Sequence, residues 1–180
     1  YMPDWPLERP YLETYRARPG EGGVLLDLIH EVDYAGWLYG WPASLQGSVK
    51  NLGVLGIDSD EIAEMNWDSP NGNGVSVAVD FLTRPTRRNM RAYGEHGTIE
   101  WNGTEGTVSL QMAGAEVMKS KSSQTSEQML TAQIQAFLDT MAGNVDPRLA
   151  TADDGVNALE VCDAARRSSE SGRTEKVATR

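Results

Sequence analysis

The sequence has little cysteine and no long apolar run, and each shortage excludes a class of protein. Its single cysteine, Cys162, rules out an internal disulfide and a cysteine-rich metal site. No uninterrupted apolar stretch approaches the roughly 20 residues that a membrane-spanning helix needs. The N-terminus also lacks the basic start and following apolar core that are typical of a signal peptide. We therefore expect a cytoplasmic protein with no membrane partner.

Basic residues are scarce relative to acidic ones. The chain has 16 Lys and Arg against 26 Asp and Glu, a formal net charge of −10. The densest basic cluster is Arg84, Arg87, Arg88 and Arg91, which follows a predicted strand and is typical of a solvated turn. Because nucleic-acid binding generally needs a basic patch facing the phosphates, we expect no nucleic-acid partner.

The spacing of apolar residues changes along the chain. Residues 1–20, rich in proline and aromatic side chains, predict an extended loop region that can include a short turn of helix. Residues 23–39 predict one continuous amphipathic helix, whose apolar stripe consists of Val24, Leu25, Leu28, Ile29 and Val32. From about 44 to 112, alternating patterns separated by glycine and asparagine turns predict roughly six strands. Residues 75–81 show this alternation, and so do Ala63, Met65 and Trp67.

Helical spacing returns near the C-terminus. Residues 128–142 and 153–169 each predict a helix, and the polar residues 119–126 before them predict a flexible connection. Cys162 lies in the apolar run Val156, Leu159, Cys162 and is expected to pack in the core. A helix, a run of strands and then helices indicate an α+β fold. We expect a single domain over 1–180, with one open, mainly antiparallel sheet and helices packed on one face.

The segment Gly22–Tyr34 carries the strongest signal for chemistry. A glycine pair opens the predicted helix, and Asp27, His30 and Asp33 follow at steps of three. At about 100° per residue, Asp27 and His30 fall opposite the apolar stripe, so they should face solvent, a ligand or another domain. A histidine beside a carboxylate suits general acid–base catalysis.

Two other interpretations of these residues remain open. The first is a surface His–Asp contact that only supports the helix. The second is a metal site in which His30 and either Asp27 or Asp33 are ligands, but no second histidine stands at a suitable spacing, and we expect no metal.

Cofactor and nucleophile motifs are missing. The sequence has no Gly-x-Ser-x-Gly, no phosphate loop ending in Gly-Lys-Ser/Thr, and no Gly-x-Gly-x-x-Gly between a strand and a helix. The run Asn71-Gly72-Asn73-Gly74 leads into a strand, the wrong context for a nucleotide site. We therefore expect no cofactor-binding residues in this chain.

Three segments in order resemble a known family. Gly22–Tyr34, Met90–Trp101 (with its Gly-Thr-Ile-Glu) and Thr151–Gly172 are similar to the opening helix, a strand–turn–strand and the closing helix of one domain. That domain is the C-terminal domain of the Gfo/Idh/MocA oxidoreductases, relatives of glucose–fructose oxidoreductase and inositol 2-dehydrogenase, with a fold like the C-terminal domain of dihydrodipicolinate reductase. Many members place the histidine four residues after the aspartate; here the step is three.

The resemblance implies half of a sugar dehydrogenase. In this family an N-terminal Rossmann domain binds NAD or NADP, while the C-terminal domain offers its first helix to a sugar-type substrate and its open sheet to a partner subunit. By this likeness Asp27 and His30 would be catalytic, and substrate would be bound by Tyr15, Arg16, Asp33 and Tyr34. The start of the chain is similar to members encoded with nonulosonic-acid sugar pathways.

The chain starts at Tyr1 and contains neither the glycine loop nor the Glu-Lys-Pro lysine of the family. We therefore expect the cofactor domain to be missing upstream of residue 1, and the chain to be inactive and without a cofactor by itself. The alternatives are a stand-alone, non-catalytic sugar-binding or dimerisation module and a cofactor-free enzyme that uses Asp27 and His30.

Overall fold

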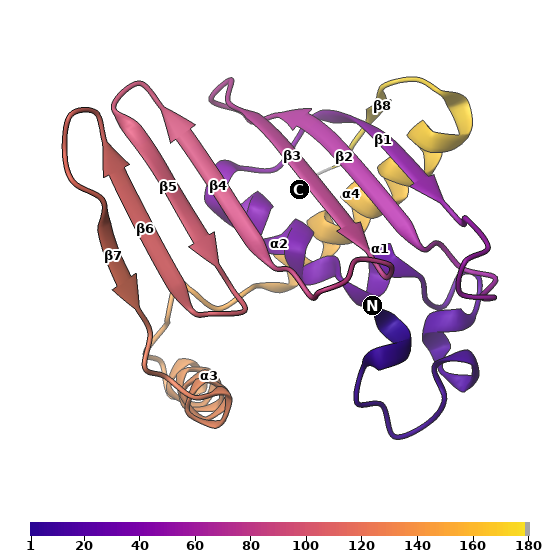
Figure 1. Cartoon of the computed structure of the whole chain (residues 1–180), viewed down its shortest axis with the longest axis horizontal. Coiled ribbons are helices and arrows are strands. Elements are labelled where there is room, and N and C mark those ends of the chain that lie inside the picture. The colour runs from indigo at the N-terminus through magenta and orange to yellow at the C-terminus, as the bar shows by residue number, and fades with distance from the viewer. Residues whose placement is uncertain (179–180) are drawn as a thin grey trace. The chain divides into compact units, whose positions relative to one another are not determined.

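The computed structural model describes residues 1–178, which form two compact units (Figure 1). Unit 1 comprises Tyr1–Leu82 and the segment from Ala150 onward, and unit 2 comprises Thr83–Leu149. Each unit has one four-stranded antiparallel sheet, in the orders β3-β2-β1-β8 and β4-β5-β6-β7. The predicted α+β class is confirmed. The strands, however, form two sheets rather than the single sheet of about six strands that we expected.

The sheet of unit 1 is built by the alternation seen in the sequence. Its strands are β1 (Ser44–Lys50), β2 (Ile62–Asp68), β3 (Gly74–Asp80) and β8 (Glu175–Lys176). Ala63 pairs with Val79, and Trp67 pairs with Val75. All four of these side chains are buried, because residues two apart on paired strands share one face.

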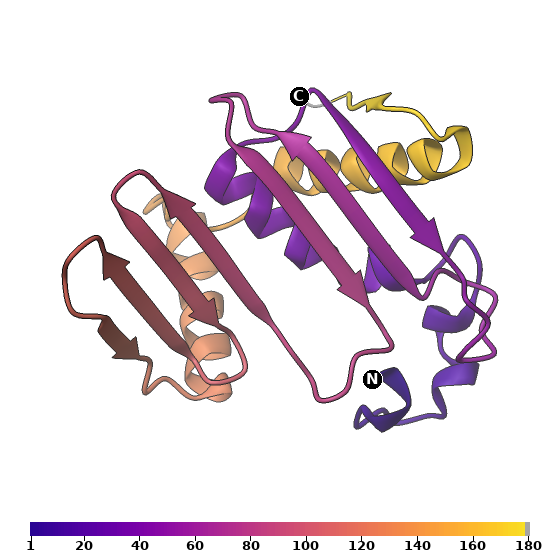
Figure 2. The ribbon, with the colours of Figure 1, turned by 45° about the horizontal axis from the view of Figure 1, so that its top comes forward.

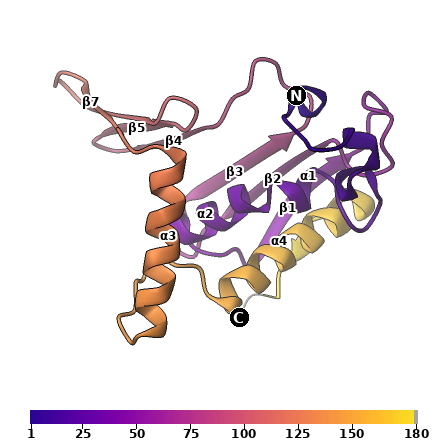
Figure 3. The same ribbon diagram turned by 90° about the horizontal axis from the view of Figure 1, so that it is seen from below.

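Three helices cover that buried face: α1 (Val24–Asp27), α2 (Ile29–Tyr39) and α4 (Ala152–Ser171) (Figures 1 and 3). Helix α4 also completes the edge of β1, since β8 pairs only with Ser44 and Leu45. The Ser168 Oγ accepts a hydrogen bond from the Gly47 N–H at 2.9 Å, and the Ser169 Oγ accepts one from the Val49 N–H at 2.9 Å. Side chains of α4 thus satisfy backbone groups that a sheet edge would otherwise leave open.

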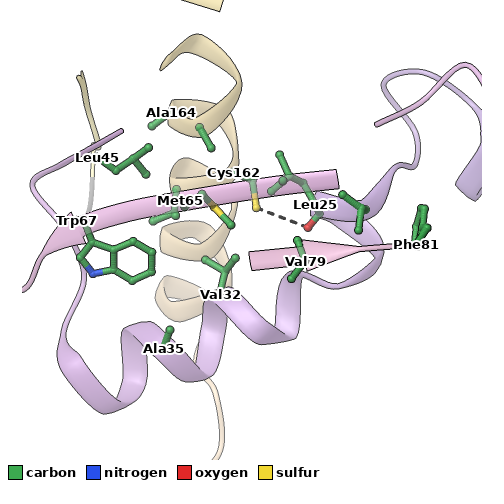
Figure 4. Packing of buried hydrophobic residues seen from close by; sticks show 14 of the residues in the cluster. Leu25, Val32, Ala35, Leu45, Met65, Trp67, Val79, Phe81, Cys162 and Ala164 are labelled. Carbon is green, nitrogen blue, oxygen red and sulfur yellow. Dashed lines mark hydrogen bonds between the residues drawn. The ribbon is translucent and has the colours of Figure 1, made fainter. Parts of the chain in front are cut away.

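The core of unit 1 lies between these helices and the sheet (Figure 4). Leu25 and Val32 come from the helices, and Met65 and Phe81 from the sheet and its end; all four are fully buried. The Cys162 thiol donates a hydrogen bond of 3.7 Å to the Leu25 carbonyl, and burial raises the pKa of Cys162 to about 12. The expected packing role of Cys162 is confirmed, whereas Leu159 from the same predicted run is exposed.

Unit 2 has regular structure but no core. It contains β4 (Asn89–Gly94), β5 (Gly97–Asn102), β6 (Thr107–Met112), β7 (Met118–Lys121) and α3 (Ser126–Met141). Within residues 83–149, all of which the structure describes, no side chain is buried. Strand β7 replaces the first part of the flexible connection that we expected at 119–126.

Near the N-terminus one prediction is wrong in detail and a second is refined. The continuous helix expected over 23–39 is interrupted at Leu28, where the backbone turns (φ −105°, ψ 25°), so that α1 ends and α2 begins (Figure 2). The loop expected over 1–20 contains three short 3-10 helices, Met2–Asp4, Tyr11–Glu13 and Tyr15–Ala17. Among residues 1–178, no helix combines the length and apolar character needed to cross a membrane.

Candidate functional site

The glycine pair at 22–23 lets three segments of unit 1 meet. A Cβ on Gly22 would lie 2.1 Å from the Tyr15 carbonyl oxygen, and one on Gly23 would lie 2.4 Å from the Asp60 Oδ1. Gly23 also has a φ of +91°, which only glycine adopts without strain. The pair is therefore required because the backbone at Tyr15 and the carboxylate of Asp60 occupy the space of side chains.

Asp60 fixes the start of α1, the helix that carries Asp27. Its Oδ2 accepts a hydrogen bond of 3.0 Å from the Leu25 N–H, and its carbonyl accepts one of 3.0 Å from the Val24 N–H. Arg166 Nη2 lies 3.4 Å from the Asp60 Oδ1. These contacts satisfy N–H groups that the first turn of a helix leaves open. No pattern in the sequence predicts this role, since Asp60 lies more than 30 residues beyond the helix start.

Asp27 does not face outward as the helical phase predicted. Its side chain is only 5% exposed, and its Oδ1 accepts a hydrogen bond of 2.5 Å from the Tyr15 hydroxyl. Arg16 Nε lies 2.9 Å from the same oxygen. That buried Nε makes no directed hydrogen bond, so the contact is an ion pair. The structure therefore brings Asp27 together with Tyr15 and Arg16, two of the predicted substrate-binding residues.

Aromatic rings hold Arg16 in place. The guanidinium carbon of Arg16 lies 4.8 Å from the Tyr15 ring centroid and 5.9 Å from that of Trp5, within the range of cation–π attraction. Trp5 in turn packs edge-on against Phe81, with ring centroids 5.6 Å apart. Arg16 is thus linked to the core through Trp5.

The pKa of Tyr15 is raised above its ordinary value. The main cause is the hydrogen bond to Asp27, which the tyrosinate would lose; burial and the negative charge of Asp27 act in the same direction. Tyr15 therefore keeps its proton at neutral pH. The residue is 44% exposed, so the hydroxyl joins a buried carboxylate to the surface.

His30 lies at the start of α2 and faces outward as predicted. Its side chain is 50% exposed, and its Nε2 lies 3.1 Å from the Glu31 Oε1. Among the described residues, no hydrogen bond or ion pair joins His30 to Asp27, so the expected pairing is not formed. Sequence reasoning missed Glu31 as the carboxylate partner, because consecutive helix residues do not normally face each other.

Asp33 and Tyr34, the other two predicted substrate residues, lie one turn beyond His30 on α2 and are partly buried. Burial raises the pKa of Asp33, as does the nearby charge of Asp154, while His30 opposes the shift. Asp154 belongs to the first turn of α4. Asp33 therefore lies on the side of α2 that approaches the start of α4.

An open hollow of about 460 Å³ lies along the N-terminal segment. Its lining consists of Pro6, Leu7, Glu8, Arg9, Glu13, Thr14, Tyr15, Arg16 and Arg18. Tyr15 and Arg16 thus border it, whereas Asp27, His30, Asp33 and Tyr34 do not. Charged, hydroxyl and aromatic groups of this kind suit a polyhydroxylated ligand better than an apolar one.

The described part of the chain forms no metal site, and its asparagine–glycine run is not a nucleotide-binding loop. Among residues 1–178, no three His, Cys, Asp or Glu side chains are grouped closely enough to hold a metal ion. The run Asn71–Gly74 joins β2 to β3 in an antiparallel hairpin, rather than leading from a strand into a helix. These residues do not fit a dinucleotide, which needs a strand–turn–helix crossover.

The motif-bearing first half of the chain decides its family. Residues 1–100 match the family model of the GFO/IDH/MocA C-terminal domain. The chain belongs to this family. The match includes the glycine pair and the residues Tyr15, Arg16, Asp27 and His30. A comparison with curated protein sequences gives no match.

Solved oxidoreductases share the fold of this GFO/IDH/MocA domain. Levoglucosan dehydrogenase in complex with NADH superposes with a TM-score of 0.84 at 15% identity, over 99% of this chain and 55% of its own. Its complex with NADH and L-sorbose superposes with a TM-score of 0.81 at 16% identity, over 93% of this chain and 54% of its own. The aldose–aldose oxidoreductase of Caulobacter crescentus, solved with glycerol, superposes with a TM-score of 0.77 at 20% identity, over 92% of this chain and 51% of its own. The chain spans about half the length of these proteins.

Proposed function

We propose that this chain is the substrate-binding and oligomerisation half of an NAD(P)-dependent oxidoreductase that acts on a sugar or sugar derivative. The family match over residues 1–100 is the observation that carries the proposal. It is supported by the likeness to levoglucosan dehydrogenase, a protein solved with NADH and L-sorbose. A single buried cysteine suits a cytoplasmic site of action.

The nicotinamide cofactor, NAD or NADP, belongs to a separate dinucleotide-binding domain in this proposal. That cofactor supplies hydride chemistry when bound. The residues of this chain bind the sugar, orient its carbinol and move the hydroxyl proton.

His30 is the residue that we propose for proton transfer. The Glu31 carboxylate lies 3.1 Å from Nε2, where it stabilises a proton on that nitrogen. In the neutral imidazole this leaves Nδ1 as the basic nitrogen, which takes the carbinol proton as hydride leaves the carbon. Half of the His30 side chain is open to a ligand. Asp33 and Tyr34 share its face of α2, since residues three and four apart are neighbours on a helix.

The sheet of unit 2 offers the surface for a second copy of the chain. On one face it carries an apolar set, Ala92, Ile99, Val108, Leu110 and Met118, and on the other a polar set, Arg91, Glu100, Ser109, Gln111 and Lys119. The open face of the unit 1 sheet is polar, with Gln46, Asn66 and Ser76 in register. The apolar face of the unit 2 sheet is therefore the one that suits a homodimer.

Sedimentation analysis tests this dimer. Ile99→Lys should weaken self-association by about a hundredfold, because it places a charge in an apolar interface. Gln111→Lys, on the polar face of the same sheet, is the matched control and should leave association unchanged. A purely monomeric wild-type chain would refute the dimer.

The function is tested on the complete gene product. We expect the coding sequence before Tyr1 to encode a strand followed by Gly-x-Gly-x-x-Gly, and later Glu-Lys-Pro. The purified product should reduce NAD or NADP with a sugar from a panel of aldoses, ketoses and polyols, followed at 340 nm. The 180-residue chain alone should neither catalyse this reaction nor bind NADH. A stop codon directly upstream, or tight NADH binding by the chain alone, would overturn the proposal.

A further inference from the structure

The Tyr15 hydroxyl stands between a buried carboxylate and the open hollow. It donates a hydrogen bond of 2.5 Å to the Asp27 Oδ1, while Tyr15 itself lines the hollow. The backbone around it is fixed on both sides. Gly22 packs on the Tyr15 carbonyl, and the Arg16 carbonyl accepts hydrogen bonds from the Gly23 N–H and the Ser59 hydroxyl.

The single proton of the Tyr15 hydroxyl determines which ligand groups it can bind. A tyrosine hydroxyl has one proton to donate and lone pairs to accept with. Because that proton is donated to Asp27, the Tyr15 hydroxyl oxygen can only accept a hydrogen bond from a ligand in the hollow. Arg16, beside it, has donors only. No described residue accepts a hydrogen bond from the terminal nitrogens of Arg16, so they are available to a ligand.

An acceptor next to a donor matches one kind of ligand group. An alcohol hydroxyl donates one hydrogen bond and accepts another, so it satisfies Tyr15 and Arg16 together. A carboxylate or phosphate only accepts, and would place its lone pairs against those of Tyr15. The hollow is therefore polarised for a hydroxyl rather than for an anion, even though three arginines line it.

We infer that Tyr15 and Arg16 form a subsite for one substrate hydroxyl, and that Asp27 is a positioning residue that acts through Tyr15. With its side chain 5% exposed and its Oδ1 shared by both neighbours, Asp27 has no open path to a ligand. This inference rests on the proposed function for the sugar nature of the substrate. It replaces the catalytic role that the family resemblance implied for Asp27.

A tyrosinate titration of the 180-residue chain tests the pair without any ligand. Absorbance at 295 nm, with Tyr15→Phe subtracted from wild type, reports Tyr15 alone among the six tyrosines. We expect its midpoint to lie above that of an exposed tyrosine and to fall in Asp27→Asn, because the amide carries no charge. Circular dichroism at each pH checks that the fold persists. An ordinary midpoint that Asp27→Asn does not move would overturn the inference.

Kinetics of the complete enzyme test the subsite. The probes are the best sugar of the panel and its series of monodeoxy analogues. In wild type, removal of the recognised hydroxyl should lower kcat/KM about a hundredfold, since it leaves both Tyr15 and Arg16 unsatisfied. Tyr15→Phe should lower kcat/KM for the parent sugar about tenfold and should shrink the penalty for that one analogue, as interacting groups do in a double-mutant cycle.

Tyr93→Phe is the matched control, because Tyr93 is an 82% exposed tyrosine on β4, outside the proposed site. It should leave every rate unchanged. If the enzyme oxidises sugars but Tyr15→Phe alters neither kcat/KM nor the analogue pattern, the subsite is wrong and the proposed function stands. If no sugar is oxidised, the proposed function fails, and the titration still decides the Tyr15–Asp27 pair.

Discussion

Units 1 and 2 have similar secondary structure but opposite burial. Each has a four-stranded antiparallel sheet and at least one long helix with apolar residues at helical spacing. In unit 1 those residues meet a sheet and are buried. In unit 2, α3 leaves Met129, Leu130, Ile134, Phe137 and Leu138 more than half exposed. The same sequence pattern therefore specifies a core in one unit and a surface in the other.

This difference fits the two proposed tasks, substrate binding by unit 1 and self-association through unit 2. Unit 1 holds Tyr15, Arg16 and Asp27 on a packed base, which a binding site needs because small displacements weaken its contacts. Unit 2 has no fully buried side chain, so it gains less from burial of apolar area, the main favourable term in folding. We therefore expect unit 1 to determine the stability of the isolated chain.

Truncation of a phenylalanine in each unit should show the contrast most clearly. Phe81 is fully buried, and Phe81→Ala should lower the free energy of unfolding by about 3–5 kcal/mol. Phe137 on α3 is 58% exposed, and Phe137→Ala should change the free energy of unfolding by less than about 0.5 kcal/mol. Urea unfolding followed by tryptophan fluorescence measures both. Similar losses in the two variants would mean that unit 2 has a core of its own.

A glycine in each unit sharpens the comparison. Gly23 and Gly143 have similar positive φ values, +91° and +97°, but only Gly23 has neighbours where a Cβ would lie. Both alanine variants carry backbone strain, and Gly23→Ala adds the clash with the Asp60 carboxylate. Gly23→Ala should therefore be more destabilising by about 2 kcal/mol in the same unfolding experiment. Equal effects would show that Asp60 moves aside freely.

Removal of the helix caps should give the smallest effect. Thr151 caps α4 and Thr125 caps α3, each in a capping box. Thr151→Ala should lower the global stability by about 1 kcal/mol, because α4 belongs to the core. Thr125→Ala should reduce only the helicity of α3, measured by circular dichroism. A global loss from Thr125→Ala would contradict the independence of unit 1 from α3.

The cap of α4 also gives a pH dependence. Hydrogen bonds from the Thr151 backbone and side chain, with a further one from Trp41, lower the pKa of Asp154 in the folded state. Its contribution to stability is therefore complete above the ordinary aspartate pKa of about 3.9 and is lost as the pH falls through the lowered value. Asp154→Ala should flatten that part of the stability profile, in unfolding measured from pH 2 to 6.

Patterns of local spacing predicted much of the fold. The alternation at 75–81 placed Val75, Val79 and Phe81 on the buried face, and helical spacing located α3 and α4 to within a few residues. Such patterns cannot show how far a sheet extends, because strand pairing depends on distant residues. They also did not predict the break at Leu28, because neither glycine nor proline occurs around that residue.

The site was predictable only in part. The likeness of Gly22–Tyr34 to the family pointed to the segment in which the proposed site lies, and helical phase correctly exposed His30. The same helical phase wrongly predicted that Asp27 is exposed. Its partners Tyr15 and Arg16 come from an irregular segment, whose fold cannot be predicted from periodic spacing. Glu31, Asp60 and Trp5 were missed for the same reason: each acts through a contact that spacing along one element does not reveal.

One measurement compares the two histidines, one in each unit. His30 lies in the proposed site, and His96 lies in the turn between β4 and β5. In the complete enzyme, His30→Asn should lower kcat for sugar oxidation by about 10²–10⁴-fold while leaving the Kd for the dinucleotide unchanged. His96→Asn should alter neither value. A His30→Asn enzyme that turns over as fast as wild type would contradict the account.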